Sequence, residues 1–234
     1  MPASNSIEFW PNPGTEVRQL FVLLHGVGDT PDGLESLGLA LRAAFPNAVV
    51  RIPEGFEAFD GSAHGRQWFS VRGITDENRA ERVAQAMPAL IEYVQTAQRS
   101  LKLKSSDTAL VGFSQGAIMA LEAVQAEHRL AGRVLAFSGR YAQLPTTVPP
   151  YTTIHLLHGA DDPVMPVTHV HEAQARLAEL KGDSTIDVAS RVGHELHPAL
   201  VQRAIHRLQT CVPLRSWAAA MQMDPVPPEG TTMH

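Results

Sequence analysis

Residues 109–122 read Ala-Leu-Val-Gly-Phe-Ser-Gln-Gly-Ala-Ile-Met-Ala-Leu-Glu, and this stretch decides the fold. A short apolar run enters Gly-Phe-Ser-Gln-Gly and a helix-forming, alanine-rich run leaves it, which predicts a strand, a sharp turn and a helix. In such a turn the two glycines permit close backbone approaches, and Ser114 is raised above the edge of the sheet. The N-terminus of the following helix places backbone N–H groups beside the hydroxyl. Ser114 is therefore a candidate nucleophile, although a glycine-bracketed turn without chemistry could show the same five residues.

The composition is that of a globular enzyme. Of 234 residues, 44% are apolar and 18% are charged, which is enough for one sizeable core. We expect a single α/β domain over residues 1–212. Residues 213–234 are rich in proline and lose periodicity, so we expect a partly disordered tail, of which Trp217 can dock. The net charge of −5 implies no basic patch for nucleic acid.

The cysteine content and the N-terminus bear on location. The single cysteine, Cys211, excludes an internal disulfide and fits a reducing compartment. The first residues lack the basic and apolar regions of a secretory signal, and no apolar run approaches 18 residues. We therefore expect a cytoplasmic protein without stable membrane insertion.

Apolar runs and helical patterns alternate along the chain. The strands expected to be buried are residues 19–24, 48–52, 109–111, 133–138, 153–158 and 186–190. The expected helices are residues 31–45, 76–103, 169–180 and 197–210. This alternation predicts a mostly parallel sheet with helices on both faces, whose ligands bind beyond the carboxyl ends of the strands.

Three further features accompany this pattern. Residues 7–10 are expected to form a short edge strand, and residues 53–74 a long loop rich in glycine and aromatic residues. For the helix that follows, Asp76 is the expected N-cap, and Pro88 the expected position of a kink or break.

A serine nucleophile needs a base and a carboxylate to orient it. His194 follows the last predicted strand and precedes a helix, which places it at the carboxyl edge of the sheet. His197 competes, but Pro198 behind it indicates that it already begins the next helix. The carboxylate is expected between serine and histidine, where Asp161 and Asp162 follow a strand. Either aspartate could serve, and the other would cap the next helix.

The loop at residues 25–29, His-Gly-Val-Gly-Asp, supplies the remaining part. Its glycines allow the backbone N–H of Val27 to point into the site. Together with the N–H of Gln115 it would form an oxyanion hole. On its own the loop could equally be a simple turn.

These motifs, in this order along the chain, resemble the phospholipase/carboxylesterase family of α/β-hydrolases, which includes the acyl-protein thioesterases. The motifs are residues 25–29, Gly-Phe-Ser-Gln-Gly at 112–116, His-Gly-Ala-Asp-Asp-Pro at 158–163 and Gly-His at 193–194. The resemblance covers about residues 20–208 and is greatest to the bacterial serine esterase branch. It implies the α/β-hydrolase fold and a serine carboxylesterase that uses no cofactor.

The resemblance also implies roles for particular residues. In the family, the aspartate directly before proline belongs to the triad, which favours Asp162, and the Gly-His motif aligns with His194. Gln-Trp-Phe-Ser at residues 67–70 resembles the family's Trp-Phe-Asp, with serine in place of aspartate. Its Trp68 and Phe69 are either acyl contacts or packed structural residues. With Met165, they are the predicted substrate-binding residues.

The sequence bears on three other functions. The same triad would serve an acyl-protein thioesterase or lysophospholipase acting on longer acyl chains. A non-catalytic relative would bind a ligand or partner without turnover. A zinc site is disfavoured because His194 and His197 are three residues apart, one short of the His-Glu-x-x-His spacing. We therefore expect no metal, and a small ester or acyl compound as the substrate; the oligomeric state is left open.

Overall fold

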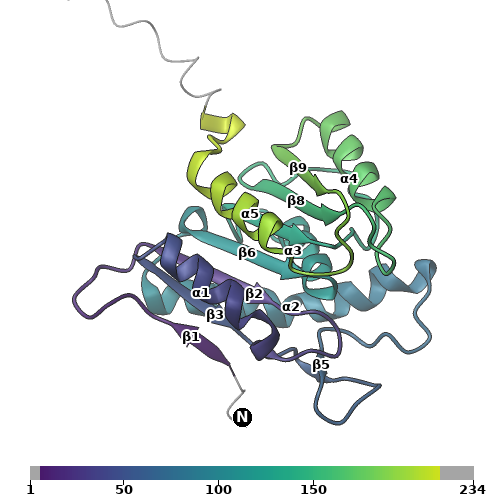
Figure 1. Cartoon of the computed structure of the whole chain (residues 1–234), viewed down its shortest axis with the longest axis horizontal. Helices are drawn as coiled ribbons and strands as arrows, with labels where there is room; N and C mark the ends of the chain where they lie inside the picture. Colours follow the sequence, from purple (N-terminus) through teal and green to yellow (C-terminus); the bar gives the residue numbers. More distant parts are fainter. Residues whose placement is uncertain (1–5, 217–234) are drawn as a thin grey trace, which may run out of the picture.

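A seven-stranded sheet runs through the computed structural model, which describes residues 6–216 (Figure 1). Its strands are β1 (Ile7–Phe9), β2 (Gln19–Leu24), β3 (Ala48–Ile52), β6 (Thr108–Phe113), β7 (Arg133–Phe137), β8 (Thr153–Gly159) and β9 (Ser184–Ala189). They lie in the order β1-β3-β2-β6-β7-β8-β9, and only β1 is antiparallel to its neighbour. The predicted parallel sheet and its edge strand are therefore confirmed.

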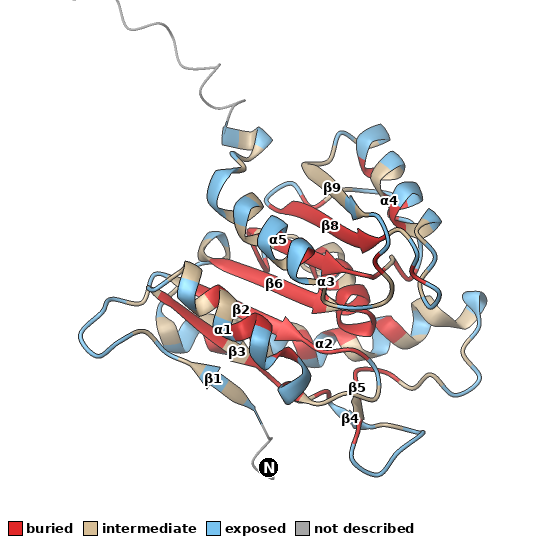
Figure 2. Cartoon of the chain, viewed as in Figure 1, coloured by how far each residue is buried: buried red, intermediate tan, exposed pale blue. Residues whose placement is uncertain are grey.

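Helices cover both faces of the sheet, as predicted. A 3-10 turn at Pro31–Leu34 leads into α1 (Glu35–Ala44), followed along the chain by α2 (Asp76–Leu101), α3 (Gln115–Ala126), α4 (Thr168–Glu179) and α5 (Pro198–Thr210). Buried side chains of α1 and α5 pack with one face of the sheet, and those of α2, α3 and α4 with the other. Because the central strands are buried on both faces (Figure 2), β2 and β6 read as nearly continuous apolar runs rather than alternating ones.

Two predictions about α2 were wrong. Its N-cap is Thr75, not Asp76: Asn78 donates its N–H to the Thr75 hydroxyl and accepts the Thr75 N–H through its side chain. This reciprocal pair is a capping box, and it leaves Asp76 as the first helical residue. The helix also continues through Pro88, so the alternative of a break there was wrong, whereas the alternative of a kink stays a prediction. Pro88 and Ala84 lie on the exposed side, so water can hydrogen-bond the Ala84 carbonyl that loses its helical donor.

The long loop at residues 53–74 contains two short antiparallel strands, β4 (Glu57–Ala58) and β5 (Arg66–Gln67). It is held against the loop that follows β2, because the N–H of Gly28 donates to the carbonyl of Arg66 at 2.7 Å. In return the N–H of Arg66 donates to the carbonyl of Asp29 at 2.9 Å. The two loops therefore form one layer at the carboxyl edge of the sheet.

The predicted tail is described only at its beginning. The N–H of Leu214 donates to the Asp183 carboxylate at 3.0 Å, which attaches this part to the loop before β9. Trp217 and the rest of the predicted tail lie outside the described residues. The division at residue 212 stays a prediction. Over residues 6–216, no helix has the length and apolar character needed to cross a membrane.

His155, in the middle of β8, gives the fold a measurable pH dependence. It has no exposed surface, and one ring nitrogen contacts the Thr185 hydroxyl at 2.9 Å. Burial, followed by the charges of Arg133 and Arg207, lowers its pKa from 6.5 to about 4. Between pH 6.5 and 4, His155 is therefore protonated in the unfolded chain but not in the folded chain. As a result, the free energy of unfolding falls as the pH drops through this range.

Between pH 6.5 and 4 this effect of His155 lowers the free energy of unfolding by about 3 kcal/mol. We expect His155→Leu to remove that pH dependence. Denaturant unfolding at several pH values measures it. Thr185→Val is the matched control, since it removes the same contact but keeps the imidazole and hence the pH dependence. An unchanged slope in His155→Leu would contradict the assignment.

Candidate functional site

The predicted sharp turn between β6 and α3 is present, and Ser114 lies at its tip. Ser114 has φ 54° and ψ −115°, a positive φ that is rare for a residue with a side chain. Its N–H donates to the carbonyl of Phe137 on the neighbouring strand at 3.0 Å. Strained backbone of this kind persists only where its surroundings hold it, and it is concentrated at functional sites.

The two glycines of the turn are required by close contacts. A Cβ at Gly112 would lie 2.2 Å from the carbonyl oxygen of Gly116, and a Cβ at Gly116 would lie 1.9 Å from that of Leu24. Both contacts are with backbone atoms, which cannot rotate away as a side chain can. The pattern Gly-x-Ser-x-Gly is therefore a packing requirement of α3 against the ends of β6 and β2.

Ser114, His194 and Asp162 form one hydrogen-bonded chain. Ser114 Oγ is 2.9 Å from His194 Nε2, and His194 Nδ1 is 2.7 Å from Asp162 Oδ2. The imidazole packs at 5.0 Å on the ring of Phe113. Since Nδ1 donates to the carboxylate, Nε2 is left free to accept the serine proton. The arrangement can activate a hydroxyl for attack on a carbonyl.

The geometry distinguishes the aspartates and histidines that the sequence left open. Asp161 is exposed, whereas the carboxylate of Asp162 is fully buried against His194. His197 is the N-cap of α5, where its ring accepts the N–H of Ala199 at 3.2 Å. The three residues brought together are thus those that the family resemblance favoured.

Asp162 stays ionised although it is buried. Burial would raise its pKa, but hydrogen bonds from the Met165 N–H, from His194 and from the Val164 N–H outweigh burial and lower the pKa. The two backbone donors lie 2.8 and 2.9 Å from Oδ1, which leaves Oδ2 for His194. The carboxylate therefore carries a fixed negative charge behind the imidazole.

The loop after β2 presents the second predicted donor. Within residues 6–216, neither the N–H of Val27 nor that of Gln115 donates to another protein group. Gln115 opens α3, where first-turn N–H groups have no helical acceptor. The loop is fixed by His25, whose Nδ1 donates to the Gly26 carbonyl at 2.7 Å while Nε2 accepts the Gly55 N–H at 2.9 Å. Burial lowers the pKa of His25, so the ring stays neutral and keeps both bonds.

Trp68 and Phe69 favour the packed alternative over direct acyl contact. Trp68 has no exposed surface and Phe69 only 3%. The indole N–H of Trp68 donates to the His25 carbonyl at 2.8 Å. The buried Gln115 side chain accepts the Trp68 N–H and donates to the Phe69 carbonyl, both at 2.8 Å. Sequence reasoning missed this role of the Gln115 amide, because nothing in the motif shows which loop its side chain meets.

Met165 is half-buried and lies three residues after Asp162. Its side chain packs against the core on the α2, α3 and α4 face, its N–H donates to Asp162, and its carbonyl contacts His158 Nε2 at 2.7 Å. These contacts explain its position, and its predicted contact with substrate stays a prediction.

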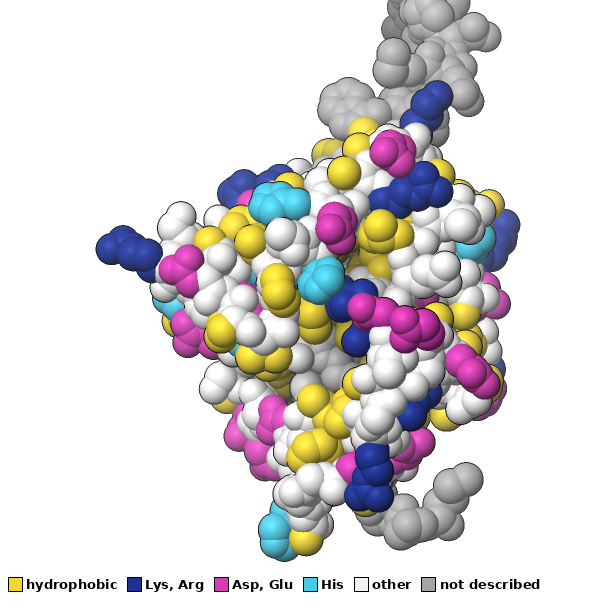
Figure 3. Space-filling view, turned by 90° about the vertical axis from the view of Figure 1, so that its right-hand side faces the viewer, with side chains coloured by type: hydrophobic (Ala, Val, Ile, Leu, Met, Phe, Trp, Pro, Cys, Tyr) yellow, Lys and Arg dark blue, Asp and Glu magenta, His cyan; other side chains and the backbone are white. Residues whose placement is uncertain are grey.

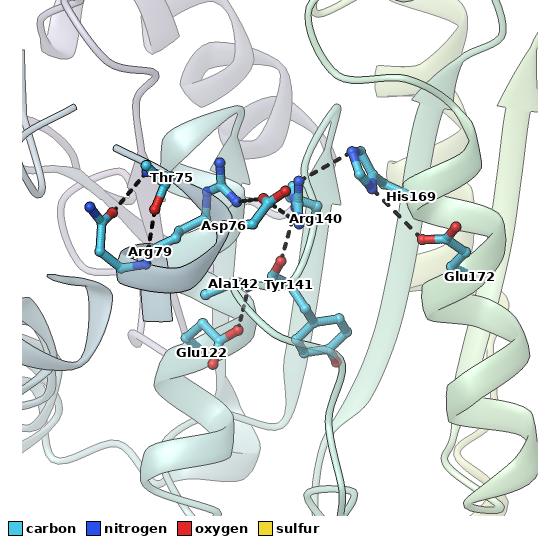
Figure 4. Close-up of polar contacts among 10 residues, drawn as sticks. Thr75, Asp76, Arg79, Glu122, Arg140, Tyr141, Ala142, His169 and Glu172 are labelled. Carbon is cyan, nitrogen blue, oxygen red and sulfur yellow. Dashed lines mark hydrogen bonds and ion pairs between the residues drawn. The ribbon is translucent and has the colours of Figure 1, made fainter. Parts of the chain in front are cut away.

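The loop after β7 is fastened to three helices (Figure 4). Arg140 forms an ion pair with Asp76 of α2 at 3.5 Å and contacts Nε2 of His169 in α4 at 3.3 Å. Farther along the loop, Glu122 of α3 accepts the N–H of Ala142 at 2.7 Å. Burial raises the pKa of Glu122. These contacts hold the loop in one position at the carboxyl edge of the sheet.

Apolar side chains gather on the face toward which the strands point (Figure 3). Loops that follow β2, β3 and β8 contribute exposed apolar residues, namely Val27, Phe56 and Val164. Such a surface can hold the hydrocarbon part of a small molecule. In the described part of the chain, no three His, Cys, Asp or Glu residues are grouped as a metal site requires.

The chain is similar to known esterases and carboxylesterases. The model of the phospholipase/carboxylesterase family matches residues 5–212. The chain is 45% identical over 202 residues to esterase YpfH of Escherichia coli K12, covering 86% of this chain and 87% of that protein. It is similar to the crystal structure of esterase PE8, with a TM-score of 0.80 and 26% identity, covering 89% of this chain and 99% of the other. The crystal structure of the Bacillus cereus carboxylesterase is similar with a TM-score of 0.72 and 18% identity, covering 89% of this chain and 94% of the other. This likeness shows the α/β-hydrolase fold.

The contact at Gly116 predicts a large effect of one methyl group. We expect Gly116→Ala to lower the free energy of unfolding by about 3 kcal/mol, because α3 must move away from the end of β2. Ala126→Gly, an exposed position in the last turn of the same helix, is the control and should cost about 1 kcal/mol. Denaturant unfolding measures both, and equal losses would show that the close approach is unimportant.

Proposed function

This chain belongs to the phospholipase/carboxylesterase family and is a hydrolase of carboxylic esters; we propose that Ser114 is its nucleophile, His194 its general base and Asp162 the carboxylate that orients the imidazole. One observation carries the proposal. It is the unbroken chain of contacts, 2.9 Å from Ser114 Oγ to His194 Nε2 and 2.7 Å from His194 Nδ1 to Asp162 Oδ2.

In the acylation step, Ser114 Oγ attacks the ester carbonyl carbon and its proton passes to His194 Nε2. The carbonyl electron pair moves to oxygen, and the N–H groups of Val27 and Gln115 donate to that oxyanion. When the tetrahedral intermediate collapses, the carbon–oxygen bond to the alcohol breaks. His194 gives its proton to the departing alcohol, and the acyl group remains on Ser114.

In the deacylation step, water takes the place of the alcohol. His194 removes a proton from the water, whose oxygen attacks the acyl carbon, and the same two N–H groups receive the second oxyanion. Collapse breaks the bond to Ser114 Oγ, which recovers a proton from His194. Because Asp162 stays ionised and buried, it stabilises the imidazolium in both steps without accepting the proton itself.

The substrate in this proposal is a small ester whose acyl group lies on the exposed apolar side chains around the site. Because Trp68 and Phe69 are almost fully buried, they offer little surface to a long acyl chain. We therefore favour a carboxylesterase of short acyl chains over an acyl-protein thioesterase or lysophospholipase. The single cysteine supports a reducing compartment, and we propose the cytoplasm.

Hydrolysis of p-nitrophenyl esters from acetate to palmitate tests the nucleophile and the acyl pocket together. We expect the parent to prefer short chains and Ser114→Ala to lose at least about 10⁴-fold in kcat, because no acyl-enzyme can form. Equal activity in Ser114→Ala would refute the assignment. An optimum at eight carbons or more would favour the long-chain alternative.

The neighbouring aspartates provide a matched pair of variants. Asp162→Asn should lower kcat by about 10⁴-fold, because the amide no longer holds the imidazole in the required tautomer. Asp161→Asn, an exposed residue one position earlier, should change kcat by less than roughly twofold. Steady-state kinetics on one ester measures both, and similar losses would show that the carboxylate was wrongly assigned.

A further inference from the structure

Trp68 is hydrogen-bonded to both segments that carry the free backbone N–H groups. Its indole N–H donates at 2.8 Å to the carbonyl of His25, two residues before Val27. Its backbone N–H donates at 2.8 Å to the side-chain oxygen of Gln115, the other donor residue. A single buried residue of the long loop thus connects the loop after β2 with the first turn of α3.

The Gln115 amide completes this connection. Its oxygen accepts the N–H of Trp68 and its nitrogen donates at 2.8 Å to the carbonyl of Phe69. Because Gln115 is 3% exposed and both ends of its amide are bonded, the side chain has one orientation. The backbone N–H of the same residue is therefore held in place relative to the loop.

The loop around Trp68 is itself held on both sides of the donor at Val27. On one side, the N–H of Gly55 donates to His25 at 2.9 Å. On the other, Gly28 and Arg66 form a backbone hydrogen bond at 2.7 Å. Movement of the N–H of Val27 or of Gln115 would therefore break buried hydrogen bonds or hydrogen bonds to the loop around Trp68.

We propose that Trp68 is a positioning residue, which sets the separation of the oxyanion donors Val27 and Gln115 through its two N–H groups. This inference rests on the proposed function. Oxyanion donors act on charge that develops in the transition state, so a small displacement lowers kcat and leaves substrate binding almost unchanged. A role in acyl binding would instead change KM.

The packing of Trp68 can be separated from its hydrogen bonding. The ring packs edge-to-face on Phe56 at 5.2 Å and lies 5.3 Å from the ring of His25. Trp68→Phe keeps an aromatic ring there but removes the indole N–H. Thr152→Val is the matched control, because it removes a buried hydrogen bond of 2.7 Å, to the carbonyl of Ala131, at the opposite edge of the sheet.

Two measurements test the proposal. One is steady-state kinetics on a single p-nitrophenyl ester. The other is the affinity for a trifluoromethyl ketone, whose carbonyl carbon is attacked by Ser114 Oγ so that its carbonyl oxygen becomes an oxyanion. We expect Trp68→Phe to lower kcat by about 10- to 100-fold with KM changed by less than about twofold, and to weaken ketone binding in parallel. Thr152→Val should leave kcat and ketone affinity within about twofold of the parent.

The other outcomes are decisive as well. Equal effects of Trp68→Phe and Thr152→Val, or a raised KM with unchanged kcat in Trp68→Phe, would overturn the positioning role. Ser114→Ala in the same series distinguishes failure of the positioning role from failure of the proposed function. Full activity in that variant would contradict the proposed function itself. Should Trp68→Phe not fold, Gln115→Met removes the side-chain hydrogen bonds at similar length and is expected to give the same loss in kcat.

Discussion

The close approach of α3 to the ends of two strands is the constraint on which the site depends. Gly116 lies so near the carbonyl of Leu24 that no side chain fits between them. This contact brings the first turn of α3 beside the loop that follows β2. Consequently that loop lies against the turn, since a Cβ at Gly26 would be 3.5 Å from the Cβ of Ser114. Any wider packing would separate the proposed nucleophile from the second proposed oxyanion donor.

The packing of α3 offsets the energetic cost of the strained backbone at Ser114. A residue with a side chain at φ 54° costs on the order of 1–3 kcal/mol, and it needs surroundings that fix it. Ser114 is held by the hydrogen bond from its N–H to β7 and by α3, most of whose residues are buried. The core on the face covered by α2, α3 and α4 therefore stabilises the turn as well as the sheet.

Much of the fold and of the triad could be predicted from the sequence because local patterns determine them. Apolar runs bounded by turns located the strands, since most positions of a strand buried on both faces are apolar. Chain order and position after a strand placed Ser114 and His194 at the same edge. The choice between Asp161 and Asp162 needed the family resemblance, because both residues follow β8 directly and only the fold determines which one is buried.

Long-range contacts made the other features hard to predict. The capping box at Thr75 was readable in principle, since Asn78 stands three residues later, but Asp76 offered a cap of the same chemical type. The continuity of α2 through Pro88 depends on which side of the helix meets water. Trp68 shows the limit most clearly: an aromatic residue in a loop beside an active site fits a substrate contact, and only its partners, 43 and 47 positions away in the sequence, reveal a buried bridge.

The side chains of this bridge bury many hydrogen-bonding groups close to Ser114, the proposed nucleophile. Buried donors and acceptors are costly when unpaired, so a closed set of partners permits few arrangements. His25, Trp68 and Gln115 form such a set, and each bonds backbone rather than flexible side chains. An apolar contact of the same area could slide by a fraction of an ångström without loss. Hydrogen bonds to fixed backbone atoms cannot, and the positions of the two proposed oxyanion donors require that precision.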